Sequence, residues 1–73
     1  MDKRSLSISG HRTSIALEPE FWAALEAMAR EKSQTMAGLI REIDENRQTA
    51  NLSSATRIAV LRWYQRRAGD QLE

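Results

Sequence analysis

The residues from 11 to 17 alternate between two kinds of side chain, with the two-residue period of a half-buried β-strand. The two faces of this strand are Thr13, Ile15 and Leu17, and Arg12, Ser14 and Ala16. A β-strand is not stable alone, because its backbone donors and acceptors need a partner strand. We find no second strand pattern elsewhere in the chain. We therefore expect the partner strand to come from a second copy of the chain.

The first ten residues are rich in serine and end in Gly10, and we expect residues 1–10 to form a flexible N-terminal arm. Leu6 and Ile8 also alternate with polar neighbours, but they fall on even numbers, whereas the inward residues of the strand fall on odd numbers. Gly10 would have to absorb this change of parity as a bulge or a break.

Two amphipathic segments follow the strand. Glu18, Pro19 and Glu20 mark a helix start, because proline suits the first helical position and carboxylates favour the positive end of the helix dipole. Thr35 is a suitable N-cap for a second helix, after a polar turn. The expected core stripes are Phe21, Leu25, Met28 and Ala29 on the first helix, and Met36, Leu39, Ile40 and Ile43 on the second.

A third helix is predicted after a polar connection. Ser53 or Ser54 caps it, and Gly69 is a natural stop. Its expected inward residues are Ile58, Ala59, Leu61 and Trp63 or Tyr64. The segment 46–73 carries a net charge of +3, whereas residues 18–45 sum to −4 and residues 1–17 to +2. A basic N-terminal segment on a nearly neutral protein permits a local anion-binding surface.

Composition limits both the means by which this small domain can be stabilised and the chemistry available to it. A domain of 73 residues is marginal alone, since a monomer of this size buries only about 60% of its unfolded surface. The absence of cysteine and the single histidine argue against disulfides and metal sites. We therefore expect oligomerisation to supply the additional stability that so small a domain needs. The same residue composition provides no set of catalytic residues and no glycine-rich phosphate-binding loop. We therefore expect that the protein is not an enzyme and has no cofactor. No apolar run approaches the ~20 residues of a membrane span, the start is no signal peptide, and a cytoplasmic protein is expected.

The order of elements resembles the ribbon-helix-helix DNA-binding fold of the Arc and MetJ repressors. The segments that carry the resemblance are RTSIALEPEFW at 12–22 and LIREID at 39–44, and NLSSA at 51–55 is similar to a third helix found in a bacterial subgroup. The resemblance implies a mostly α, intertwined homodimer with an intermolecular two-stranded antiparallel ribbon. Residues 11–46 would form the ribbon-helix-helix core, and residues 47–73 the third helix and C-terminal tail. The implied dimer core is Ile15, Leu17, Phe21, Leu25, Met36, Leu39, Ile40 and Ile43.

In this family the ribbon enters the major groove of DNA, and the N-terminus of the second helix binds phosphate. Carried over by position, the base-contacting residues are Arg12, Ser14 and Ala16. The phosphate-contacting residues are Gln34, Thr35, Met36 and Ala37, and Lys3 and Arg4 of the arm add further contacts. Ala16 departs from the family pattern, which places a long polar side chain there, and offers only apolar contact.

The function that we expect is a sequence-specific DNA-binding protein, a homodimeric bacterial transcriptional regulator or repressor that binds double-stranded DNA and can form higher-order assemblies on it. One alternative is an antitoxin-type or adaptor protein that binds a protein partner through the third helix. Another is a dimerisation module without DNA binding.

Overall fold

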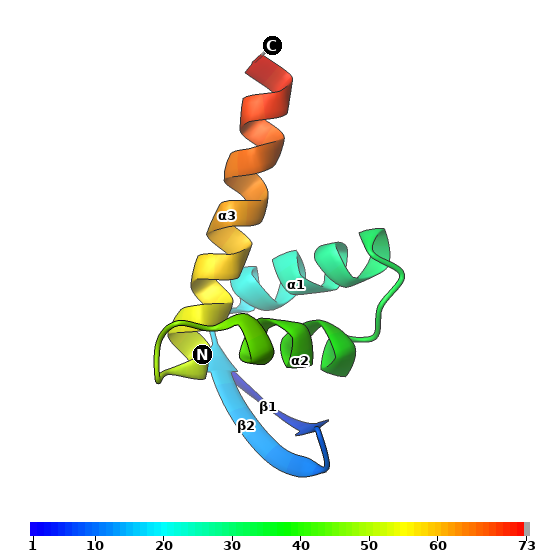
Figure 1. The fold of residues 1–73 in the computed structure, drawn as a ribbon, viewed down its shortest axis with the longest axis vertical. Helices are drawn as coiled ribbons and strands as arrows, with labels where there is room; N and C mark the ends of the chain where they lie inside the picture. The colour runs from blue at the N-terminus through cyan, green and yellow to red at the C-terminus, as the bar shows by residue number, and fades with distance from the viewer. Residues whose placement is uncertain (73) are drawn as a thin grey trace.

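The structure is a computed structural model that describes residues 1–72, with side chains described as far as residue 69. Two strands form an antiparallel ribbon and three helices follow it (Figure 1). The elements are β1 (Asp2–Ile8), β2 (His11–Leu17), α1 (Pro19–Glu31), α2 (Met36–Asn46) and α3 (Leu52–Leu72). The expected ribbon and helices are therefore present. None of the helices in the described part of the chain is both long and apolar enough to cross a membrane.

The ribbon is a hairpin made by one chain. β1 pairs with β2 from Asp2 opposite Leu17 to Ile8 opposite His11. The two residues of the turn, Ser9 and Gly10, have φ angles of 52° and 81°. Positive φ at both central positions is the requirement of a type I′ turn, whose twist matches that of the two strands. The turn therefore joins the strands without a bulge.

This hairpin corrects two expectations. The segment 1–10 is not a flexible arm, because residues 2–8 form β1, and the strand that completes the ribbon here belongs to the same chain. In every cross-strand pair the two residue numbers add to 19, so even residues of β1 share a side with odd residues of β2. The opposite parity of Leu6 and Ile8 was the signature of this hairpin rather than of a break.

The inner face of the ribbon packs under the helices. Ile8, Ile15 and Leu17 are buried there, and the indole Nε1 of Trp22 on α1 donates a 2.8 Å hydrogen bond to the carbonyl oxygen of Asp2. Five residues of the expected core are at most 2% exposed within one chain: Ile15, Leu17, Leu25, Leu39 and Ile40. Phe21, Met36 and Ile43 are half-buried and pack against this core.

The turn between α1 and α2 is closed by backbone and side-chain contacts. Ser33 has a φ of 54°, and the N–H of Gln34 donates to the carbonyl oxygen of Ala29 at 2.8 Å, which caps the end of α1. The Nζ of Lys32 lies 2.8 Å from Oε1 of Glu42 on α2. These contacts fix the direction in which α2 begins.

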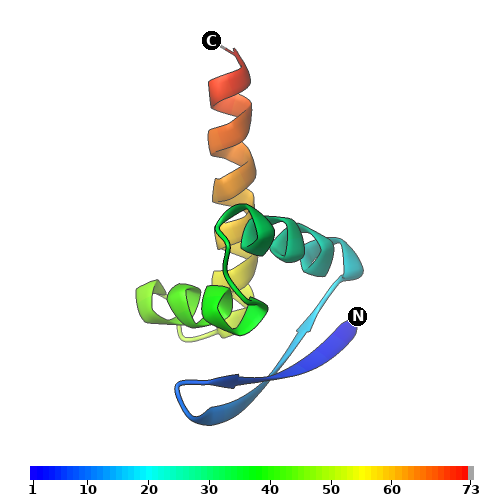
Figure 2. The same ribbon diagram turned by 90° about the vertical axis from the view of Figure 1, so that its right-hand side faces the viewer.

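α3 differs from its expected pattern at both ends. Asn51 caps it, because its Oδ1 accepts from the backbone N–H of Ser54 at 3.1 Å, and the helix continues past Gly69 to Leu72. The exposed fractions of Ile58 and Leu61 are 40% and 55%, so their predicted inward orientation is wrong. The buried residues of α3 are Ala55, Thr56 and Val60. The distal half of α3 projects beyond α1 and α2 (Figure 2).

Candidate nucleic-acid interface

The ribbon presents one face that no helix covers. The alternate residues of both strands lie there because their neighbours pack inward on the helices. This outer face consists of Lys3, Ser5, Ser7, Arg12, Ser14 and Ala16. All of these residues are exposed except Ala16, which is half-buried. The structure thus places the sequence-predicted base readers of β2 together with Lys3 and two serines of β1.

The outer face carries groups that can form hydrogen bonds and ionic contacts with a nucleic acid. It holds two cations and three hydroxyl groups and no carboxylate. At its centre the hydroxyl oxygens of Ser5 and Ser14 lie 3.1 Å apart across the strands. An arginine can donate two hydrogen bonds to guanine, a serine can donate or accept with either base type, and a two-stranded ribbon fits the major groove.

Arg4 lies on the opposite face from Lys3. Its guanidinium is 4.5 Å from the centre of the Trp22 ring, and Nη1 is 3.5 Å from Oε2 of Glu26. The two cations that the sequence groups on one arm are therefore separated by the strand alternation. Only Lys3 belongs to the outer face.

α2 lies above the ribbon in both views, and in Figure 1 its N-terminus is on the side of the ribbon's turn (Figures 1 and 2). Oγ1 of Thr35 accepts from the backbone N–H of Gly38 at 3.0 Å. The N–H groups of Met36 and Ala37 belong to the first turn, where a helix provides no internal acceptor. A Cβ at position 38 would lie 3.1 Å from Oγ1 of Thr35, so Gly38 gives room to this cap.

Gln34, just before this helix, is engaged within the chain. Its Nε2 donates to Oε2 of Glu42 at 2.8 Å, and Lys32 donates to the other carboxylate oxygen. These two hydrogen bonds, with the charge of Lys32, lower the pKa of Glu42 below its ordinary value. The network therefore orients the first turn of α2 and leaves the Gln34 amide nitrogen occupied.

A second ionic contact ties α3 to the start of α1. Nε and Nη2 of Arg57 each lie 3.1 Å from Oε1 of Glu18. A backbone hydrogen bond at Glu18 and then the contact with Arg57 lower the pKa of this carboxyl. This arginine is therefore part of the packing between helices and not of a free basic surface.

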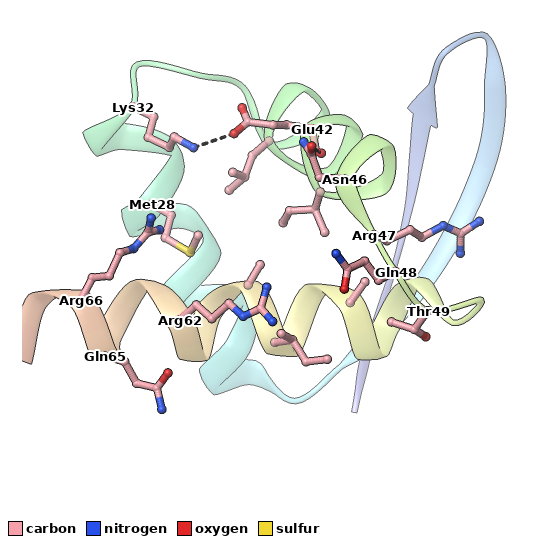
Figure 3. Close-up of a pocket in the computed structure, with 15 residues that line it drawn as sticks. Met28, Lys32, Glu42, Asn46, Arg47, Gln48, Thr49, Arg62, Gln65 and Arg66 are labelled. Carbon is pink, nitrogen blue, oxygen red and sulfur yellow. Dashed lines mark hydrogen bonds and ion pairs between the residues drawn. The ribbon is translucent and has the colours of Figure 1, made fainter.

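A separate groove of about 640 Å³ opens between α1, α2 and α3 (Figure 3). Its apolar lining includes Met28, Leu39, Ile43, Ile58 and Ala59, and its polar rim includes Lys32, Glu42, Arg47, Arg62 and Arg66. The groove is formed by the helices, not by the outer face of the ribbon. Among the described residues, no three side chains of histidine, aspartate or glutamate come together as a metal site.

Sequence reasoning missed Ser5 and Ser7 as members of the outer face and treated Lys3 as part of an arm. The signal that identifies them is the parity of Leu6 and Ile8 together with the dipeptide Ser9-Gly10, which suits a two-residue hairpin turn. His11 is exposed beside that turn.

Comparison with known proteins supports the architecture. The model of a family described as the ribbon-helix-helix domain matches residues 1–64, a range that includes both strands, α1, α2 and the first part of α3. No curated protein and no solved structure matches the chain. Because the match covers most of the sequence and the elements occur in the same order, the chain belongs to the ribbon-helix-helix family.

Proposed function

We propose that the protein is a sequence-specific DNA-binding regulator of transcription that acts in the bacterial cytoplasm and inserts its ribbon into the major groove. The single observation that carries this proposal is the outer face, where Lys3 and Arg12 flank three serine hydroxyls with no carboxylate among them. Ribbon-helix-helix domains are typically DNA-binding regulators, which supports the same function.

Each base-facing residue has a role that follows from its chemistry. Arg12 donates two hydrogen bonds to a guanine, Ser14 bonds to a neighbouring base, and Ala16 contacts a thymine methyl. The N–H groups of Met36 and Ala37 bind a phosphate at the edge of the groove. Thr35 and Gln34 act indirectly, because their side chains fix the first turn of α2.

The test compares two arginines that lie on opposite faces of the ribbon. Duplexes selected by the protein from a random pool define the preferred site, and binding is then measured at constant salt. Arg12→Ala should cost about 1–3 kcal/mol on that site and relax the preference at one base position. Arg4→Ala removes the same charge from the inner face and should leave the selected sequence unchanged. Failure of the unaltered protein to select any sequence would overturn the proposal, as would unaltered selection by Arg12→Ala.

A second property is proposed for α3, which is association with a second copy of the chain. The side chains of Leu61 and Tyr64 on this helix are 55% and 48% exposed. Large apolar side chains that are exposed side by side mark an interaction surface. The opposite net charges of the segments 46–73 (+3) and 18–45 (−4) are largely paired within one chain, by Arg47 with Asp44, Arg57 with Glu18 and Arg67 with Glu31, so the contact with a second copy is proposed to be apolar.

Sedimentation at micromolar concentrations tests this association. The unaltered chain should sediment as a dimer, and Leu61→Glu should sediment as a monomer, since the new charge would be buried without a partner. Arg30→Glu, on α1, is a control for charge alone. A monomeric unaltered chain would exclude self-association and leave the exposed face of α3 to a different protein.

A further inference from the structure

The groove between α1, α2 and α3 lies apart from the outer face of the ribbon and has no role in the function proposed above. Its volume of about 640 Å³ falls within the range of about 300–1,000 Å³ that is typical of small-molecule sites. Such sites combine an apolar lining with a few polar groups that orient the ligand. The apolar lining here comes from all three helices and consists of Met28, Leu39, Ile43, Ala55, Ile58 and Ala59.

α3 contributes one continuous face to the groove. Its lining residues recur at the spacing of three and four positions that keeps side chains on one side of a helix, and they are Ala55, Ile58, Ala59, Arg62, Gln65 and Arg66. The first turns of this face are apolar and the later turns are basic. From residue 59 to residue 66 the helix rises by about 10 Å. The wall that α3 provides therefore changes from apolar to cationic along the length of the groove.

Two of the four cations that line the groove already have partners. Nζ of Lys32 lies 2.8 Å from Oε1 of Glu42, and Nε of Arg47 lies 3.0 Å from Oδ1 of Asp44. Glu42 is the one carboxylate among the residues that line the groove, and its other oxygen accepts from Gln34. These contacts neutralise the α2 side of the groove.

Arg62 and Arg66 are the two remaining cations. Neither forms an ion pair with a side chain of residues 1–69, the range over which side chains are described. Both lie on the wall contributed by α3 (Figure 3), four positions apart, where like charges destabilise a helix. An anionic group between the two guanidinium groups would relieve this repulsion and accept charge-assisted hydrogen bonds from them. This end of the groove is therefore suited to an anion.

Ile58 lies on the apolar part of the same wall and remains in contact with water. It is 40% exposed, whereas Leu39 and Met28, which line the groove from α2 and α1, are 1% and 4% exposed. An apolar molecule in the groove would cover Ile58, and removal of apolar surface from water is favourable. Leu61 and Tyr64, which we propose for association with a second copy, do not line this groove.

We propose that the groove binds an organic anion, with the apolar body of the ligand on Ile43, Ile58 and Ala59 and its anionic head between Arg62 and Arg66. A linear molecule that extends about 10 Å from its head would reach from the cationic turns of α3 to the apolar turns. The proposal depends on the groove alone. It is tested by direct binding to the protein without DNA, so its failure would leave the proposed DNA binding untouched.

Three ligands separate the contribution of the head from that of the body. Decanoate has both features, butyrate has the same head with a short body, and decyltrimethylammonium has the same body with the opposite charge. Calorimetric titration of the full chain at low salt should show binding of decanoate. Butyrate should bind at least about tenfold more weakly because it buries fewer methylene groups. Decyltrimethylammonium should also bind at least about tenfold more weakly, since it loses the charge-assisted hydrogen bonds. Equal binding of the anion and the cation of the same length would overturn the proposal.

Variants of the two arginines test the position of the head. Arg62→Gln and Arg66→Gln should each weaken decanoate binding about tenfold, since each removes one charged donor. Arg41→Gln is the matched control, because Arg41 lies on α2, pairs with Glu45 and does not line the groove. Its affinity for decanoate should equal that of the unaltered chain. An equal loss in Arg41→Gln and Arg62→Gln would show attraction by net charge alone and would overturn the proposal.

A variant that fills the groove tests the position of the body without altering any charge. Ala59 is half-buried in the lining, and Ala59→Leu should weaken decanoate binding at least about tenfold while circular dichroism still shows a folded helical protein. A second copy of the chain is the other candidate occupant. If the unaltered chain does not bind decanoate, and Arg62→Gln or Ala59→Leu changes its sedimentation from dimer to monomer, the groove is an interface between copies and the proposal is wrong.

Discussion

Arg4 lies with its guanidinium 4.5 Å from the centre of the Trp22 ring. The same indole donates its N–H to the carbonyl oxygen of Asp2 at 2.8 Å. Trp22 is 1% exposed, so this one side chain attaches the beginning of β1 to α1 from both the ring face and the ring edge.

Truncation of this ring should be among the most costly changes in the chain. Trp22→Ala removes a large buried side chain and leaves the Asp2 carbonyl without its donor, and we expect a loss of about 3–5 kcal/mol in the free energy of unfolding. Urea titration followed by circular dichroism measures it. The side chain of Trp63 on α3 is only half-buried, so Trp63→Ala should lower the free energy of unfolding clearly less than Trp22→Ala. Equal losses would show that Trp22 does not anchor the ribbon.

The turn of the hairpin can be strengthened or weakened by one residue. Gly10 has a φ of 81°, and Gly10→Ala should cost about 1–2 kcal/mol because a Cβ is strained in the left-handed region. Ser9 has a φ of 52°, and Ser9→Asn should raise stability, since asparagine before glycine is preferred in a type I′ turn. Thermal unfolding of both variants checks the opposite signs. A stabilised Gly10→Ala variant would contradict the type I′ geometry.

Acid should weaken the turn between α1 and α2. Lys32 and Gln34 lower the pKa of Glu42 in the folded chain below its ordinary value. Its contribution to stability is therefore complete above the unfolded pKa and is lost as the pH falls through the lowered folded value. Melting temperatures from pH 7 to pH 3 should fall less steeply in Glu42→Gln than in the unaltered protein.

A control for this pH effect is available on the same helix. Asn46 donates its Nδ2 hydrogen to the backbone carbonyl of Glu42 at 2.8 Å, and this bond does not involve the carboxylate. Asn46→Ala should lower the melting temperature without changing its slope against pH. An unaltered slope in Glu42→Gln would assign the acid sensitivity to other groups.

Phosphate binding at α2 can be tested without altering a charge. Thr35 has an extended conformation, with ψ of 161°, which is the geometry required of a residue before proline. Met36→Pro should therefore fold and lose one backbone donor, and Met36→Ala is the control for the lost side chain. Affinity for DNA should fall by about 1.5–3 kcal/mol in the proline variant relative to the alanine variant, with the same preferred sequence. Equal affinities would exclude a contact at this N–H.

Much of this fold follows from local rules in the sequence. Pro19 at the start of α1 and Thr35 at the start of α2 were predicted because each satisfies a specific need of a helix N-terminus, and both helices begin there. The core stripes of α1 and α2 were predicted because helical spacing fixes which side chains share a face. Leu25, Leu39 and Ile40 are indeed buried.

The parts that local rules could not predict depend on contacts distant in the sequence. Leu61 and Ile58 fit a helical stripe, but the face of α3 that packs on the rest of the chain is the one that carries Thr56 and Val60, so they remain exposed. Gly69 does not end α3, because glycine permits a stop without requiring one. Arg4 and Lys3 are neighbours in sequence, and their separation onto different faces of the ribbon follows only once residues 2–8 are known to pair as a strand, whose side chains alternate.

The hairpin also determines how the chain can begin to fold. Its most distant pair, Asp2 with Leu17, is separated by 15 positions, and its turn needs only two residues. Hairpins of this kind close in about 1–10 μs, whereas a strand borrowed from another molecule must wait for a collision whose frequency depends on concentration. The ribbon can therefore form in an isolated chain before the helices dock on it, and its folding rate should not change on dilution.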